Sequence, residues 1–198
     1  VDLDLFRPRG GRREDGVVRI GAMVRPNTPR RAPDVTMRVL REIEKKFGGR
    51  VQISVFGCSP VDPDYLKLAQ GVGFENAGIL DRHGVAAFLG QLDVFADFST
   101  YQAMGLTALE AMASGAAVIV PAKGGSSLFA RHEENALVVE TEAESLCQIA
   151  LERLVEDHAL RTRLQQRAMF DACKQHPEQA AWNILNVLLD GKGGKPSR

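Results

Sequence analysis

The chain has 198 residues, which is enough for one sizeable hydrophobic core. Its 25 basic and 25 acidic side chains cancel, so the overall charge gives no basis for a nucleic acid or a membrane surface as partner. No stretch approaches the roughly 18 apolar residues that a membrane span needs, and the start of the chain lacks the apolar core of a signal peptide. The sequence begins with Val, and we expect it to be a fragment of a longer protein.

The first third of the chain predicts a linker followed by a strand, a helix and a second strand. Residues 1–16 mix Pro and Gly with charged residues, which is typical of a linker, and residues 17–23 form an apolar strand pattern. A loop rich in Arg and Pro follows. Residues 33–47 begin with Pro, carry apolar residues at helical spacing, end in basic residues and precede two glycines, so they predict a helix. Residues 51–57 predict the second strand.

The rest of the chain continues this alternation. In chain order we expect a short helix at 65–70, a weak strand at 77–80, a helix at 82–92, a strand at 93–99, a helix at 107–115, and strands at 116–122 and 134–140. Three helices at 142–156, 158–173 and 177–189 follow, and residues 191–198 are predicted to be a disordered tail. Short apolar strands that alternate with helices indicate an α/β protein. We expect a Rossmann-like parallel sheet with helices on both faces and a helical C-terminus, formed by residues 17–190.

Parallel sheets of this kind bind ligands beyond the carboxyl ends of their strands. The candidate loops therefore follow the predicted strands, after Met23, Gly57, Leu80, Ser99 and Ala122. The three cysteines, Cys58, Cys147 and Cys173, are odd in number and widely spaced. That pattern is typical of reduced thiols in the cytoplasm and predicts neither a disulfide framework nor a metal site.

One segment at this edge, residues 99–125, is nearly free of charge. Glu110 is the single charged residue between Asp97 and Lys123, although a quarter of the chain is charged. The helix that starts near Gly105 has free amides and a positive dipole at its beginning, where a phosphate fits. Thr107 and Glu110 also match the spacing of a capping box, in which Glu110 would bond back to the amide of Thr107. A ligand contact and a capping role both remain open for Glu110.

Two further features favour an anionic ligand at the same edge. A second glycine-rich turn, Gly124–Gly125, follows the next predicted strand. Residues 1–31 contain eight arginines against four acidic residues, and several of these arginines lie in the loop after the first strand. Two glycine-rich loops and a basic loop at one edge of the sheet are the pattern expected for a phosphate-containing ligand.

The motif "GLTALEAMASGAAVIVPAKGG", followed by "HEENALVVE", resembles the donor-binding half of retaining glycosyltransferases of the GT-B fold, family 4 or group 1. The segment "VDLDLFRP" resembles the interdomain linker of that family, and "VVRIGAMVRPNTPRRAP" resembles its first strand and basic loop. The resemblance covers about residues 1–185. It implies transfer of a sugar from a nucleotide-sugar donor to an acceptor hydroxyl, in surface polysaccharide assembly by analogy.

The resemblance also implies roles for particular residues. The amides of Gly105, Leu106 and Thr107 would hold the donor diphosphate, and Glu110 would accept hydrogen bonds from the ribose hydroxyls. Arg25, with Arg30 or Arg31, would stabilise the charge that develops on the leaving group without a metal ion or other cofactor. The loop residues Gly57, Ile79 and Leu80 complete the predicted donor site, with the nucleobase near Gly78–Leu80.

The sequence departs from the family pattern at Gln102, where the family has the first of two glutamates separated by seven residues. We assign Arg25, Gln102 and Glu110 to the catalytic set. The amide of Gln102 both donates and accepts hydrogen bonds, which changes how sugar hydroxyls would be recognised. Two alternatives remain: a nucleotide-binding pseudo-enzyme, and a Rossmann-like phosphosugar enzyme with "GGSS" as its phosphate loop.

The same resemblance implies which partners this chain has. An N-terminal acceptor-binding domain of the same protein should precede this chain, and any peripheral association with a membrane would occur through that domain. The isolated chain should bind the donor and should not catalyse transfer.

Overall fold

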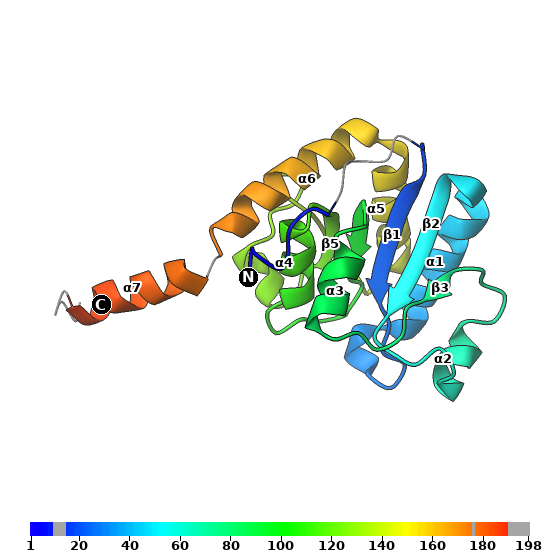
Figure 1. Cartoon of the computed structure of the whole chain (residues 1–198). Helices are drawn as coiled ribbons and strands as arrows, with labels where there is room; N and C mark the ends of the chain where they lie inside the picture. The colour runs from blue at the N-terminus through cyan, green and yellow to red at the C-terminus, as the bar shows by residue number, and fades with distance from the viewer. Residues whose placement is uncertain (10–14, 176, 190–198) are drawn as a thin grey trace.

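The computed structural model of the chain describes residues 1–9, 15–175 and 177–189. Within these residues, six parallel strands form one sheet in the order β3-β2-β1-β4-β5-β6 (Figure 1). The strands are β1 Val18–Met23, β2 Val51–Phe56, β3 Glu75–Asn76, β4 Val94–Ala96, β5 Ala117–Pro121 and β6 Leu137–Val139. This strand order reverses direction between β1 and β4, as in a Rossmann fold, and confirms the expected fold class.

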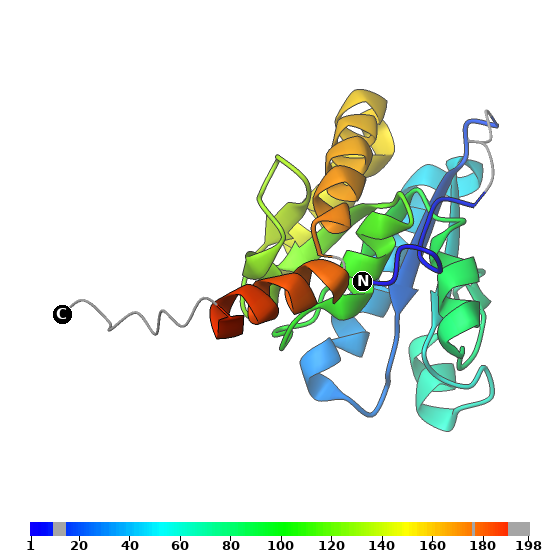
Figure 2. The same ribbon diagram turned by 60° about the vertical axis from the view of Figure 1, so that its left-hand side comes forward.

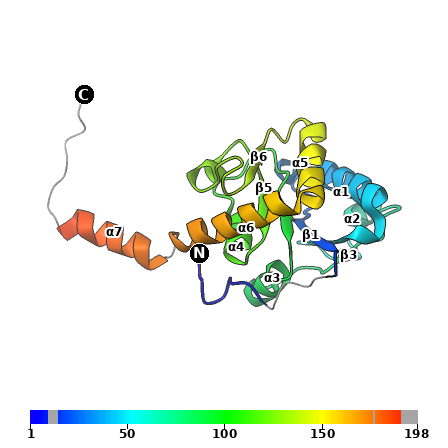
Figure 3. The same cartoon turned by 90° about the horizontal axis from the view of Figure 1, so that it is seen from above.

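Helices cover both faces of the sheet. They are α1 Pro33–Phe47, α2 Pro63–Leu68, α3 Arg82–Leu89, α4 Leu106–Ala113, α5 Glu144–Glu156, α6 His158–Cys173 and α7 Pro177–Leu189. α1 and α5 share one core with the sheet, and α3 and α4 share the other (Figure 3). In α1 the buried residues Met37, Leu40, Ile43 and Phe47 recur every three or four positions, which places them on the face that packs on the sheet.

The described part of the predicted linker, residues 1–9, lies against the α3–α4 face of the domain (Figure 2). Phe6 is buried in the core that α3 and α4 form, and Asp2 pairs with Arg82 at the start of α3. Burial of a large aromatic ring removes much apolar surface from water, which stabilises this attachment. Residues 10–14 lie outside the described part of the chain.

The expected weak strand at 77–80 is wrong. The strand is β3, Glu75–Asn76, which pairs in parallel with Ser54 and Val55 of β2. Gly78 then adopts a φ of 82°, a conformation that favours glycine and turns the chain away from the sheet. The residues predicted as strand therefore form the loop that leads into α3.

The predicted helix at 177–189 is confirmed as α7, which extends away from the rest of the domain (Figure 1). Four of its large apolar side chains are exposed: Trp182, Ile184, Leu185 and Leu188. Trp182, the largest of them, is 62% exposed. The predicted disordered tail, 191–198, lies outside the described residues.

Candidate functional site

The loops at the carboxyl edge of the sheet are joined by hydrogen bonds between distant parts of the chain. The backbone amide and the hydroxyl of Thr100, after β4, both donate to the carbonyl of Arg30, after β1, at 2.9 and 3.3 Å. The amide of Gly57, after β2, donates to the carbonyl of Gly78, after β3, at 2.8 Å. The structure thus brings together the loops that the sequence placed at this edge.

The start of α4 is an open set of backbone donors. Gly105 is the N-cap residue, with a φ of 77°, and no side chain caps the helix. The first helical hydrogen bond runs from the amide of Leu109 to the carbonyl of Gly105, so the amides of Leu106 and Thr107 precede the helical bonding pattern. A side chain at Gly105 would approach the ring of Phe129. Free amides at a helix N-terminus can bind an anion, and the diphosphate site itself stays a prediction.

Glu110 does not belong to a capping box. Because Gly105 is the N-cap, Thr107 lies inside the first turn of α4 and Glu110 lies in the second turn. Burial raises the pKa of Glu110 to about 7, and the charge of Arg82 acts in the opposite direction. Among the described residues, none forms a hydrogen bond or ion pair with this carboxylate. The capping interpretation is therefore wrong, and the Glu110 carboxylate is available to a ligand.

The three arginines of the basic loop are near one another but differ in exposure. Arg25 and Arg30 are exposed, whereas the Arg31 side chain is only 15% exposed. Arg31 Nη1 lies 3.8 Å from Asp97 Oδ2, and its Nε atom is buried without a hydrogen-bond partner. Burial lowers the pKa of Arg31, the Asp97 charge opposes this shift, and the charges of Arg30 and Arg25 add to it. The loop thus concentrates positive charge at the sheet edge.

Gln102 is buried in a polar network at the end of β4. Its Nε2 atom donates to Asp97 Oδ2 and to Ser99 Oγ, each at 2.8 Å. The hydroxyl of Ser99 in turn donates to Asp97 Oδ1 at 2.5 Å. Asp97 is a residue that the sequence interpretation missed. A charged residue within the otherwise apolar run of residues 94–98 was the signal that could have identified it.

The second glycine-rich turn has a packing role. A Cβ atom at Gly124 would lie 2.0 Å from the carbonyl oxygen of Gln102, and one at Gly125 would lie 2.1 Å from that of Ala103. The amide of Gly125 already donates to the Gln102 carbonyl at 2.8 Å. Ser126 Oγ likewise donates a hydrogen bond to the carbonyl of Pro121. These contacts and hydrogen bonds within the fold disfavour the alternative in which "GGSS" holds a phosphate.

The predicted nucleobase region is an exposed loop. Ile79 is 78% exposed, and Leu80 is half-buried against the core that α3 forms. Gly57, with a φ of 109°, lies against Met23 and the carbonyl of Val24, so a side chain there would clash with the end of β1. Gly57 therefore lets the ends of β1 and β2 approach each other beside the basic loop.

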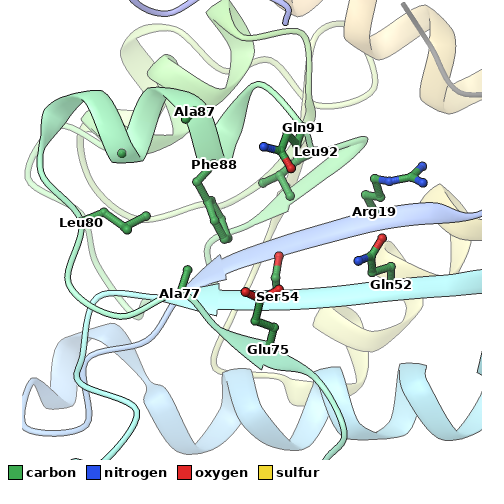
Figure 4. A pocket seen from close by; sticks show the side chains of 11 residues that line it. Arg19, Gln52, Ser54, Glu75, Ala77, Leu80, Ala87, Phe88, Gln91 and Leu92 are labelled. Atoms are coloured by element: carbon green, nitrogen blue, oxygen red, sulfur yellow. The ribbon is translucent and has the colours of Figure 1, made fainter. Parts of the chain in front are cut away.

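A cavity of about 390 Å³ lies between α3 and the strands β1, β2 and β3, and it extends to the loop after β3 through Ala77 and Leu80 (Figure 4). Arg19, Gln52, Ser54 and Glu75 lie on the sheet side, and the ring of Phe88 points in from α3. Leu80 is the predicted donor-site residue that also lines this cavity. None of the described residues that line the cavity belongs to α4 or to the loop before it, so the cavity is separate from the α4 N-terminus.

Among the described residues, no group of three or more His, Cys, Asp or Glu side chains is arranged to hold a metal ion. None of the described helices combines the length and the apolar character that crossing a bilayer requires.

A family model described as "Glycosyl transferases group 1" matches residues 14–157. The chain is 29% identical over 213 residues to a D-inositol 3-phosphate glycosyltransferase of Nocardioides sp., and the match covers 94% of this chain and 46% of the relative. The chain spans less than half the length of the curated relatives that it matches.

Solved structures share this fold. The C-terminal domain of LpcC, a glycosyl transferase group 1 family protein of Francisella tularensis, superposes with a TM-score of 0.74 at 23% identity, covering 88% of this chain and 97% of that domain. HepE of Anabaena, solved in complex with UDP and glucose, gives a TM-score of 0.75 at 14% identity, covering 96% of this chain and 55% of HepE. At these identities the likeness demonstrates the fold.

Proposed function

Since the chain belongs to the group 1 glycosyl transferases, as its motif predicted, we propose that it is the donor-binding half of a retaining enzyme that transfers a sugar from a nucleotide-sugar to an acceptor hydroxyl. The observation that carries this proposal is Glu110, a partly buried carboxylate without a hydrogen-bond or ion-pair partner among the described residues. It lies on the helix whose N-terminus has no side-chain cap and whose preceding loop bonds to the basic loop through Thr100 and Arg30. Unpartnered buried charges are costly, so their retention points to a ligand.

Each part of a nucleotide-sugar has a matching group at the sheet edge. The amides of Leu106 and Thr107, with Arg25 and Arg31, suit the diphosphate. The Glu110 carboxylate suits the two ribose hydroxyls, because one carboxylate can accept from both. The exposed loop at Ile79 and Leu80 remains the proposed position of the base, and Gln102 that of the sugar.

The proposed chemistry is electrostatic. When the bond between the sugar and the diphosphate breaks, negative charge develops on the leaving phosphate, and the Arg25 and Arg31 guanidiniums stabilise it in the transition state. In this arrangement the protein itself supplies the positive charge that stabilises the leaving phosphate. We therefore propose that transfer does not depend on a metal ion. Activity of the full-length enzyme in excess EDTA is the direct test.

The proposed partner is an N-terminal acceptor-binding domain of the same protein. The chain spans less than half of its curated relatives, and α7 presents an exposed apolar surface that suits burial against another domain. We propose that the whole enzyme acts in the cytoplasm, that any membrane association occurs through that domain, and that residues 1–198 alone bind the donor without turnover. Sugar transfer by residues 1–198 alone would contradict this assignment.

A thermal-shift panel tests donor binding. We expect one class among UDP-, GDP- and dTDP-sugars to raise the melting temperature, because a ligand that binds only the native state stabilises it. Arg25→Ala should lower the affinity for that nucleotide by on the order of 1.5–3 kcal/mol, the range for hydrogen bonds to charged groups. Its melting temperature without ligand should not change, because Arg25 is exposed. No shift with any donor would overturn the proposal. A donor that binds the full-length protein but is never transferred would favour the pseudo-enzyme.

A further inference from the structure

Asp97 holds a central place in the polar network at the end of β4. Its two carboxylate oxygens accept hydrogen bonds from different groups: Oδ1 from the amide and hydroxyl of Ser99, and Oδ2 from Gln102 Nε2. Asp97, Ser99 and Gln102 are 7%, 1% and 4% exposed. A buried hydrogen-bond network of this kind fixes the orientation of its members.

The network determines which end of the Gln102 amide is free. The nitrogen uses its two hydrogens on Asp97 and Ser99, and the reversed amide would set an oxygen against the Asp97 carboxylate. The Oε1 atom of Gln102 accepts no hydrogen bond from the described residues, and it is not among their fully enclosed, unpartnered polar atoms. Gln102 therefore presents a neutral acceptor, with its donor side turned inward.

The same carboxylate also faces the basic loop. Arg31 Nη1 lies 3.8 Å from Asp97 Oδ2, which is within ion-pair range but beyond a hydrogen bond. Arg31 Nε is enclosed, and the guanidinium donates no hydrogen bond to the described residues, so the part of this side chain that is exposed, 15%, keeps donors for an incoming anion. Asp97 thus lies between the group proposed for the diphosphate and the group proposed for the sugar.

We propose that Asp97 is a positioning residue for the donor: it orients Gln102 so that its carbonyl oxygen accepts from a hydroxyl of the donor sugar, and it holds Arg31 toward the diphosphate. This inference rests on the proposed function. It also explains the amide at position 102. A glutamate there would set two carboxylates about 3 Å apart, and like charges this close cannot both be ionised.

The roles of Asp97 and Gln102 can be tested by exchanging the carboxylate and the amide between the two positions. The probes are UDP-glucose, GDP-mannose and dTDP-glucose with their parent diphosphates, titrated into residues 1–198. The measured quantity is the ratio of diphosphate Kd to nucleotide-sugar Kd, which isolates the contribution of the sugar. We expect Asp97→Asn and Gln102→Glu each to lower this ratio about tenfold. The double variant should restore it to within about threefold of wild type, because it again holds one carboxylate and one amide.

A matched control is Gln52→Glu, an identical change on exposed β2 surface that lines the separate cavity, and it should leave the ratio unchanged. A merely structural role for Asp97 would lower the melting temperature of the single variants and leave the ratio intact, which would overturn the inference. A double variant no better than the singles would also overturn it. If wild type binds none of the probes, the proposed function fails together with the inference.

Discussion

Two carboxylates with low exposure, Asp171 on α6 and Glu110 on α4, have opposite surroundings. Asp171 accepts hydrogen bonds from Arg131 at 2.5 Å, Asn135 at 3.0 Å, Arg167 at 3.1 Å and Lys174 at 2.9 Å. Glu110 accepts none from the described residues. Burial alone would raise the pKa of Asp171, but these donors lower it to about 2, whereas burial raises the pKa of Glu110 to about 7.

The difference separates a carboxylate that serves the fold from one that is available for binding. Asp171 connects the end of α6 to the loop at 131–135 through Asn135, which also donates a hydrogen bond to the carbonyl of Phe129. Glu110 makes no such connection and reduces stability when it ionises. A side chain that costs stability and joins no elements is a strong candidate for ligand contact.

The two groups predict opposite dependences of stability on pH. The folded pKa of Asp171 lies below its ordinary value of 3.8, so its stabilisation is fully present above pH 4 and is lost as the pH falls toward 2. The pKa of Glu110 in the folded state, about 7, lies above its ordinary value of 4.5. Between these two pH values the folded state binds a proton that the unfolded state has lost. Stability therefore falls as the pH rises from about 4.5 to 7.

The largest expected effect is the loss of the Asp171 network. Asp171→Asn should lower the free energy of unfolding at pH 7 by about 3 kcal/mol, because three cations and a buried amide lose a charged acceptor. Denaturant unfolding followed by circular dichroism measures this change. Asp64→Asn is the matched control, since its pair with Lys67 is exposed and surface pairs contribute little. Equal stability of both variants would contradict the structural role of Asp171.

The second prediction concerns Glu110 without ligand. Glu110→Gln removes the charge that burial disfavours, so it should raise the free energy of unfolding at pH 8 by on the order of 2 kcal/mol. At pH 5 the wild-type carboxyl group is already largely protonated, and the gain should disappear. Melting temperatures of both proteins between pH 5 and 8 measure this difference. A gain that does not vary with pH would show that the charge is not its cause.

The smallest effect is on nucleotide affinity. Glu110→Gln should weaken binding of the stabilising nucleotide about tenfold, or roughly 1.4 kcal/mol, because neutral hydrogen bonds replace charge-assisted ones. Calorimetric titration measures the affinity, and the 2′,3′-dideoxy nucleotide should bind wild type and variant equally. Unchanged affinity for the natural nucleotide would remove Glu110 from the ribose site. Higher stability combined with weaker binding is the signature expected of a functional carboxylate.

Much of the fold could be predicted from local pattern. The apolar run of β5 and the Pro and Gly that flank α1 are local signals, and the structure places both elements where these signals lie. The positions of the two loops after strands of one parallel sheet likewise predicted that the loop before α4 lies at the same edge as the basic loop. By contrast, β3 carries Glu75 and Asn76, which have weak strand preference, so its pairing with β2 determines its position.

The candidate site, too, could be predicted from the sequence only in part. Sequence spacing identified Glu110 and the start of α4 but allowed a capping box, because Thr107 and Glu110 have the required separation. The structure decides against it, since Gly105 adopts the left-handed conformation and becomes the N-cap.

The sequence by itself determined the alternation of strands and helices, the glycine turns and the motif at residues 105–125, because these depend on neighbours a few positions apart. Tertiary structure alone decided which polar groups are satisfied. Asp171 bonds Arg131 and Asn135, which are 40 and 36 positions away, and Thr100 bonds Arg30, which is 70 positions away. Hydrogen bonds between such positions form only when the sheet brings its loops together, and they determine which carboxylate is bonded within the fold and which is left for a ligand.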